Sequence, residues 1–128
     1  MGRHWYTAGE YRGRIERLAK RIRPFGLGAD VIVGFPGETD ADHRATVALV
    51  EALPFTYLHV FPYSPREGTA APRLGGPPAP EVVRERSAEL RALAARKAAE
   101  HRAARDGGRA DLVLEGRAAG MRDALTED

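Results

Sequence analysis

Apolar residues recur along the chain at two kinds of spacing, and each kind predicts a different element. Spacings of three and four over residues 7–22, 40–53 and 81–105 predict three helices, each with one apolar stripe. Short runs rich in Val, Ile and aromatic residues predict strands at 29–34 and 56–61. Because helices alternate with strands and cross between them, the strands should be parallel and covered by helices, in an α/β sheet or barrel.

The first helix shows its pattern most clearly. Thr7 and Glu10 have the spacing of a capping box, in which each residue bonds the other's backbone at the helix start. The apolar stripe of this helix consists of Tyr11, Ile15, Leu18 and Ile22. We expect the stripe to face the core, since an amphipathic helix buries its apolar side.

Alternation within the two strands predicts two different faces of the sheet. One face should carry the aliphatic residues Val31, Val33, Leu58 and Val60. The other face should carry Asp30, Ile32 and Gly34 from the first strand, and Tyr57, His59, Phe61 and Tyr63 from the second. The second face is therefore predicted to be aromatic and partly polar.

Two strands are too few for a complete structure of this class. Two parallel strands cannot close a barrel or give a sheet whose two faces are both covered. The chain is therefore predicted to be a piece of something larger. We expect an open sheet edge and exposed apolar surface, and hence poor solubility of the isolated chain.

Composition narrows the possible chemistry. The chain has 128 residues, of which 43% are hydrophobic, so one domain with a real core is possible. It contains no cysteine, which excludes disulfides and thiolate metal ligands from this chain, and its four histidines lack ligand spacing. We predict no metal ligand here. The formal charge of +2 is weak evidence for a polyanionic partner, and the excess of arginine over lysine is also what a GC-rich genome produces.

The chain also lacks the usual signals for membranes and export. No run approaches the roughly 18 apolar residues that a membrane-spanning helix needs. The first residues, MGRHWYTAGEY, do not form a signal peptide, because no apolar stretch follows the charges. We expect a cytoplasmic protein without a membrane partner.

The sequence GFPGET follows the first strand and opens the second helix. Gly34 and Gly37 permit positive φ or close backbone approach, and Thr39 is expected to cap the helix. Ligands of parallel α/β structures bind at this end of the strands, so the loop is a candidate site. The alternatives are a simple tight turn, or a phosphate held by the Gly37–Thr39 backbone. The loop matches neither a Walker motif nor a dinucleotide fingerprint.

A second loop, within LHVFPYSPREGT, follows the second strand and should open on the same edge. It offers His59, Tyr63 and Arg66 beside the first loop. Each has an ordinary explanation as well: His59 can be a satisfied interior histidine, and Arg66 a solvated cation. Two such loops side by side favour a binding site at this edge.

Together the segments DVIVGFPGETDAD and FTYLHVFPYSPREGTAA resemble the radical S-adenosyl-L-methionine methylthiotransferases. The resemblance implies the C-terminal part of a partial (β/α)6 TIM-like radical SAM barrel in residues 1–106. Residues 107–128, in which ADLVLEG is predicted to be a strand, resemble the start of a truncated TRAM β-barrel, an RNA-binding domain.

The resemblance also implies an activity and cofactors. Members of this family attach a methylthio group to a modified adenosine in tRNA or to a ribosomal-protein aspartate. They use S-adenosyl-L-methionine and two 4Fe-4S clusters, whose cysteine ligands are absent from this chain. We therefore expect no catalytic residue here and no activity of the chain alone. The expected partner is tRNA, and the full-length enzyme is expected to be a monomer.

Short motifs within the second loop suggest a branch of the family. LHVFPYSPR resembles the branch that acts on N6-threonylcarbamoyladenosine in tRNA, next to the anticodon. The branches for isopentenyladenosine and for the ribosomal-protein aspartate remain alternatives. A fragment that only binds RNA or another partner, and an unrelated α/β enzyme that holds a phosphate on GFPGET, are alternatives from other classes.

The resemblance carries over to a limited set of site residues. The cofactor-binding residues that it implies are Asp30, Ile32, Gly34, Gly37 and Glu38. The implied substrate-binding residues are His59, Tyr63 and Arg66. Glu38 lies one residue later than in the general radical-enzyme pattern, so a structural role at the start of the helix is the alternative for this carboxylate.

Overall fold

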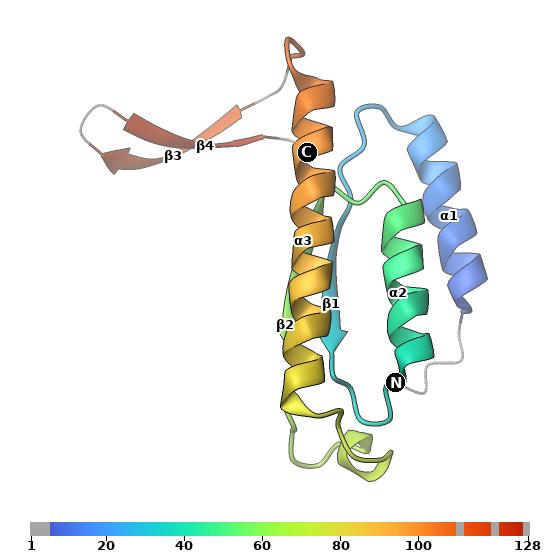
Figure 1. The fold of residues 1–128 in the computed structure, drawn as a ribbon. Helices are drawn as coiled ribbons and strands as arrows, with labels where there is room; N and C mark the ends of the chain where they lie inside the picture. Colours follow the sequence, from blue (N-terminus) through green and yellow to red (C-terminus); the bar gives the residue numbers. More distant parts are fainter. Residues whose placement is uncertain (1–5, 110–111, 119–120, 127–128) are drawn as a thin grey trace.

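The computed structural model describes residues 6–109, 112–118 and 121–126, and it has one layer of helices against a two-stranded sheet (Figure 1). Its elements in chain order are α1 (Ala8–Arg21), β1 (Gly28–Val33), α2 (Asp40–Ala52), β2 (Tyr57–Pro62), the short 3-10 helix η1 (Ala71–Arg73), α3 (Pro80–Arg105), β3 (Leu112–Ala118) and β4 (Met121–Thr126). The three helices and two strands that the pattern predicts are confirmed as α1, α2, α3, β1 and β2. Each observed end lies within one residue of the predicted end.

Strands β1 and β2 are parallel neighbours, as the crossover order predicts. Their register places Asp30 opposite His59 and Ile32 opposite Phe61. The α2 helix connects the two strands, which is the βαβ arrangement that parallel pairing requires. Together, the sheet and its helices form a small α/β unit that is compatible with part of a larger domain.

Local sequence explains where the helices begin. Thr7 and Thr39 each cap a helix, and each forms a capping box with the residue three positions later, Glu10 or Asp42. Pro80 occupies the first turn of α3, where a missing N–H costs nothing. These are the helix starts that the sequence indicates.

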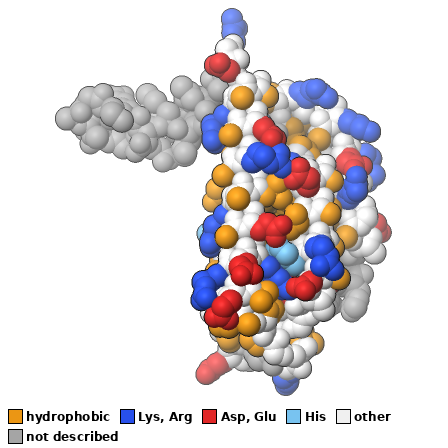
Figure 2. All heavy atoms as spheres, viewed as in Figure 1, with side chains coloured by type: hydrophobic (Ala, Val, Ile, Leu, Met, Phe, Trp, Pro, Cys, Tyr) orange, Lys and Arg blue, Asp and Glu red, His pale blue; other side chains and the backbone are white. Residues whose placement is uncertain are grey.

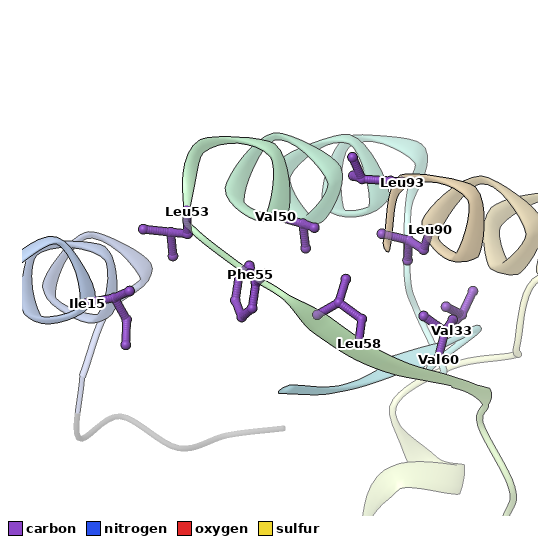
Figure 3. Close-up of a cluster of buried hydrophobic side chains, with 9 residues drawn as sticks. All are labelled: Ile15, Val33, Val50, Leu53, Phe55, Leu58, Val60, Leu90 and Leu93. Atoms are coloured by element: carbon purple, nitrogen blue, oxygen red, sulfur yellow. The ribbon is translucent and has the colours of Figure 1, made fainter. Parts of the chain in front are cut away.

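The core lies between the sheet and the helices (Figure 3). Strand residues that alternate onto the helix side meet side chains from all three helices. The buried hydrophobic residues are Ile15, Val33, Val50, Leu53, Phe55, Leu58, Val60, Leu90 and Leu93. The predicted aliphatic face of the sheet is therefore confirmed, because Val33, Leu58 and Val60 belong to this core.

The opposite face of the sheet is largely open. Tyr57 is 61% exposed, and Asp30 and His59 are exposed too. The prediction that the apolar stripe of α1 faces the core is only partly right. Ile15 is buried, but Leu18 and Ile22 are 45% and 48% exposed. The described residues give the C-terminal half of α1 too little apolar surface to pack on, which is consistent with a fragment of a larger domain.

Strands β3 and β4 form a separate antiparallel sheet, with Leu112 opposite Thr126. Helix α3 ends before it, and Gly107 has a φ of 71° just beyond the helix. The prediction of a strand at 110–116 is confirmed from Leu112 onward, and residues 110 and 111 lie outside the described part. Assignment of 107–128 to a TRAM domain, with a boundary at 106, stays a prediction.

Among the described residues, no helix combines the length and apolar character that crossing a membrane would require.

Candidate functional site at the strand ends

Both predicted loops leave the sheet at the same end, to which the arrow of β1 points in Figure 1, because β2 runs parallel to β1. The Tyr63 N–H donates to the Val33 carbonyl at 2.7 Å, so the two chains remain paired as the loops begin. Residues 34–39 then turn into α2, and residues 63–79 lead through η1 into α3. The expectation that the loops open on one edge is thus confirmed.

A hollow of about 780 Å³ lies at this edge; we call it the strand-end hollow. Ile32 of β1, Phe35 of the first loop and Phe61 of β2 line it, as do Tyr63 and Arg66 of the second loop. Further wall comes from residues 62, 64, 69–71 and 74. The lining is mainly apolar and aromatic, which suits a flat organic ligand with few polar groups.

Two aromatic rings organise the hollow. Phe35 and Tyr63 meet edge to face, with ring centroids 5.3 Å apart and planes at 73°. The Tyr63 hydroxyl is buried and has no hydrogen-bond partner among the described residues. A buried unpaired hydroxyl is costly, so this group is available to a ligand or to a part of the protein outside this chain.

Arg66 lines the hollow from an exposed turn. The turn is closed by the Thr69 hydroxyl, which donates to the Arg66 carbonyl at 2.8 Å, and Gly68 allows it with a φ of 77°. Within the described part of the chain, no hydrogen bond or ion pair engages the Arg66 guanidinium. This cation is free to bind a carboxylate or a phosphate in two-point fashion.

The glycine loop has the geometry that its sequence predicts, but its backbone N–H groups bond to acceptors of the protein itself. Gly34 and Gly37 have φ values of 79° and 81°. The Gly37 N–H donates to the Gly76 carbonyl at 3.2 Å, and the Glu38 N–H to the Phe35 carbonyl at 2.8 Å. The close backbone approach therefore brings the two loops together.

These contacts argue against a phosphate on the GFPGET backbone. The N–H groups of Gly37 and Glu38 already have protein acceptors, and the Thr39 N–H donates to Asp42 Oδ2 at 3.0 Å. The Gly34 N–H donates to the Glu38 carboxylate. The turn is thus a structural connection that shapes the hollow.

A polar cluster from α3 supports the loop, and it was not among the predicted site residues. Arg86 is buried and donates to Asp40 Oδ1 at 2.6 Å, and its Nη1 lies 3.4 Å from Glu38 Oε1. The bond from Arg86 holds the pKa of the Asp40 carboxyl below its usual range. His43 is also buried, with Nε2 2.7 Å from Glu89 Oε2. A sequence signal did exist, because Arg86 lies three residues after Val83 and four before Leu90, on the apolar side of α3.

Asp30 and His59 form a pair of their own on the open face. Their Oδ1 and Nδ1 atoms are 3.6 Å apart, and both side chains are mostly exposed. The His59 ring packs edge to face on Phe61, with centroids 5.2 Å apart. This pair extends the polar surface along the sheet, but neither residue lines the hollow.

The predicted site residues therefore fall into three positions. Ile32, Tyr63 and Arg66 line the hollow. Gly34, Gly37 and Glu38 build the loop beside it, and Asp30 and His59 lie on the open sheet face.

Figure 2 shows acidic and basic side chains interleaved along α3, whereas Lys and Arg gather over α1. Within the described ranges no three His, Asp or Glu side chains form a group that could hold a metal ion.

Sequence comparisons relate the chain to tRNA-modifying enzymes. It is 37% identical to a tRNA-2-methylthio-N(6)-dimethylallyladenosine synthase of Syntrophus aciditrophicus, over 94% of this chain and 26% of that protein. A synthase of the same name from Kineococcus radiotolerans is 39% identical over 97% of this chain and 24% of its own length. A threonylcarbamoyladenosine tRNA methylthiotransferase of Thermotoga maritima is 43% identical over 59% of this chain and 17% of its own length.

The chain thus spans about a quarter of the length of these curated relatives. No protein-family model matches it. The relatives support the resemblance to the methylthiotransferase family, and they agree with the fragment character of the fold.

Proposed function

We propose that this chain supplies the C-terminal part of the radical domain of a tRNA methylthiotransferase and acts only together with the rest of such an enzyme. The observation that carries the proposal is similarity along 94–97% of the chain to enzymes named for methylthio modification of tRNA. The strand-end hollow supports the proposal, because its apolar and aromatic lining suits a flat organic ligand.

The hollow fits the adenosyl half of S-adenosyl-L-methionine. Ile32 and Phe35 offer an apolar wall for a flat base, and the unpaired Tyr63 hydroxyl offers a hydrogen bond. When bound together with a reduced 4Fe-4S cluster, the cofactor supplies the radical and methyl chemistry of this family. Cysteine ligands for the clusters would come from outside this chain, which has none.

The remaining predicted cofactor residues have supporting roles in this proposal. Gly34, Gly37 and Glu38 shape the loop that presents Phe35, and Asp30 lies along the sheet face that would continue toward the barrel interior. His59 lies opposite Asp30, so it would face substrate approaching over the open face.

Arg66 is proposed to bind the tRNA. Its guanidinium lines the mouth of the hollow without a protein partner among the described residues, and a free guanidinium pairs well with phosphate or carboxylate. One such charged contact is worth about 1.5–3 kcal/mol, or roughly ten- to a hundredfold in binding.

The target base has two candidates. The threonylcarbamoyl group carries a carboxylate that Arg66 could bind, which favours the branch indicated by the LHVFPYSPR motif. An isopentenyl group is apolar and suits the aromatic lining of the hollow. Relatives named for dimethylallyladenosine match more of this chain than the threonylcarbamoyladenosine relative does, so we give the isopentenyl candidate at least equal weight.

The proposal is tested in a chimera, in which this chain replaces the matching quarter of the full-length relative from Syntrophus aciditrophicus. We expect the purified chimera, with both clusters loaded, to methylthiolate tRNA. Mass spectrometry of nucleosides from tRNA carrying either modified adenosine then identifies the preferred base. A chimera that folds, holds both clusters and binds tRNA but transfers no methylthio group would contradict the enzymatic assignment, and would favour a fragment that only binds RNA.

The role of Arg66 is tested separately in the same chimera. Arg66→Ala should lower tRNA methylthiolation about ten- to a hundredfold but leave cofactor cleavage without tRNA unchanged. Arg73→Ala is the matched control, because Arg73 belongs to the same loop but does not line the hollow. If both activities survive in Arg66→Ala, the side chain has no role in binding; if both fail, it serves the fold or the cofactor.

A further inference from the structure

Arg86 is unusual among the charged residues of α3. Its side chain is 7% exposed, whereas the other α3 arginines with described ion pairs, Arg84 and Arg96, are 72% and 47% exposed. A buried guanidinium is costly unless its donors are satisfied. Here both terminal nitrogens have acceptors: Nη2 donates to Asp40 Oδ1 at 2.6 Å, and Nη1 donates to the Glu38 carbonyl at 3.4 Å.

Glu38 connects this arginine to the glycine loop. Its side chain is 11% exposed, and its Oε1 lies 3.4 Å from Arg86 Nη1. The other oxygen, Oε2, accepts the N–H of Gly34, the first residue after β1. One carboxylate therefore joins the first half of α3 to the point where the strand becomes a loop.

Two further contacts fix the same loop. A Cβ at Gly34 would lie 2.7 Å from Val83 Cγ2, so α3 packs directly on the backbone there. At the other end of the loop, the Gly37 N–H donates to the Gly76 carbonyl. Phe35 lies between these anchors and forms part of the hollow, with its ring against Tyr63.

We propose that Arg86 is a positioning residue for the strand-end hollow: by holding Glu38, it fixes the Gly34 backbone and thereby places Phe35. Arg86 does not line the hollow, so it acts through the loop and not on a ligand. The identity of the ligand, S-adenosyl-L-methionine, rests on the proposed function, whereas the anchoring of the loop does not.

The charge and the forked shape of arginine both enter this proposal. Without the guanidinium, the nearly buried Glu38 carboxylate keeps His43 Nδ1, 3.9 Å away, but loses the arginine cation, so water competes for the carboxylate and weakens its bond to Gly34. Lysine would keep the charge but could not reach the Glu38 carbonyl and the Asp40 carboxylate from one planar group. Lysine is therefore expected to rescue only part of the effect.

The first test measures hydrogen exchange of backbone amides in the 128-residue chain. Arg86→Met should speed exchange of the Gly34 amide about tenfold or more, and Arg86→Lys should have an intermediate effect. The matched control is Arg91→Met, which also removes a guanidinium of α3. The Arg91 guanidinium donates to the Val60 carbonyl, which lies away from the loop. Arg91→Met should leave Gly34 exchange unchanged even where it lowers the melting temperature.

The proposal is overturned if Gly34 exchange in Arg86→Met equals that of wild type or of Arg91→Met. It is equally overturned if the wild-type Gly34 amide shows no protection, because Glu38 would then not hold it. A general loss of stability is separated from loop anchoring by the exchange of the Val50 amide in the core part of α2, which should respond similarly to both substitutions.

The second test uses the full-length chimera. Arg86→Met should raise the KM for S-adenosyl-L-methionine about ten- to a hundredfold, with a smaller change in kcat at saturation, because Phe35 is displaced. Arg91→Met should leave KM unchanged. Faster Gly34 exchange with an unchanged KM would overturn the positioning role while leaving the methylthiotransferase assignment intact. An inactive wild-type chimera would contradict the proposed function, whereas the exchange experiment would still test the anchor.

Discussion

Gly34 lies directly against Val83, where a Cβ on the glycine would come within 2.7 Å of Val83 Cγ2 and 3.2 Å of Val83 Cγ1. The strand end and the first turn of α3 can meet this closely because one of the two residues has no side chain. The φ of 79° at Gly34 adds a second requirement for glycine, since L-residues rarely adopt that conformation. The first residue of the glycine loop is thus required by packing as well as by the turn.

Gly34→Ala should destabilise the chain by about 2–5 kcal/mol, the sum of left-handed strain and overpacking against Val83. Urea denaturation measures the change. The matched control is Gly68→Ala, since Gly68 has a similar φ of 77° but nothing within 4 Å of its Cβ position. It should cost about 1–2 kcal/mol. Equal costs for the two substitutions would show that the contact with Val83 is unimportant.

Tyr63→Phe should not destabilise the chain, although Tyr63 is partly buried. Its hydroxyl has no partner among the described residues, so removal should leave the free energy of unfolding unchanged or raise it by about 1–2 kcal/mol. In the active chimera the same substitution should lower kcat/KM for S-adenosyl-L-methionine about 2- to 12-fold, the value of one neutral hydrogen bond. A destabilised variant with unchanged kinetics would mean that the hydroxyl serves the fold.

Asp40→Asn should change how stability depends on pH. Arg86 holds the pKa of Asp40 below its usual range, so the carboxylate stabilises the folded chain above about pH 4. That contribution is lost as the pH falls through the lowered folded pKa. Wild type should therefore lose more stability between pH 6 and pH 3 than Asp40→Asn does, as measured by urea denaturation at each pH.

The control for this experiment is Glu67→Gln, which changes an exposed loop carboxylate that forms no ion pair with any described residue. Its pH dependence should equal that of wild type. Identical profiles for Asp40→Asn and wild type would mean that the pairing of Asp40 with Arg86 does not contribute to stability in solution.

Leu90→Ala should destabilise the chain by about 2–5 kcal/mol, because Leu90 is 1% exposed in the centre of the core. Leu74→Ala removes the same atoms from a side chain that is 57% exposed, and should cost less than about 1 kcal/mol. Thermal unfolding of both variants measures the difference. A small effect of Leu90→Ala, together with a broad transition, would indicate that the isolated chain lacks a packed core.

Much of the fold could be predicted from the sequence because its signals are local. The capping boxes at Thr7 and Thr39 and the proline at 80 define helix starts through neighbours three residues away or fewer. Alternation in 57–63 separated Leu58 and Val60 from His59 without knowledge of any partner. The predictions were weaker where burial depends on distant elements, as with Leu18, which is on an apolar stripe and yet exposed.

The candidate site could be predicted in part. Ile32, Tyr63 and Arg66 were identified from motifs, and they do line one hollow. Phe35 was not identified, because its role depends on the edge-to-face contact with Tyr63 from another loop. The role of Glu38 beside Gly34 became clear only from the hydrogen bond between them.

The sequence by itself determined the order of α1, β1, α2, β2 and α3, the parallel pairing and the two faces of the sheet, since periodicity, caps and turn residues act over a few positions. Tertiary structure alone decided that Arg86 lies buried beside Glu38, 48 residues away, and that the loop N–H groups are taken by protein acceptors. The physical reason is that the cost of burying a charge depends on which groups surround it in space. Spacing along the chain cannot supply that information.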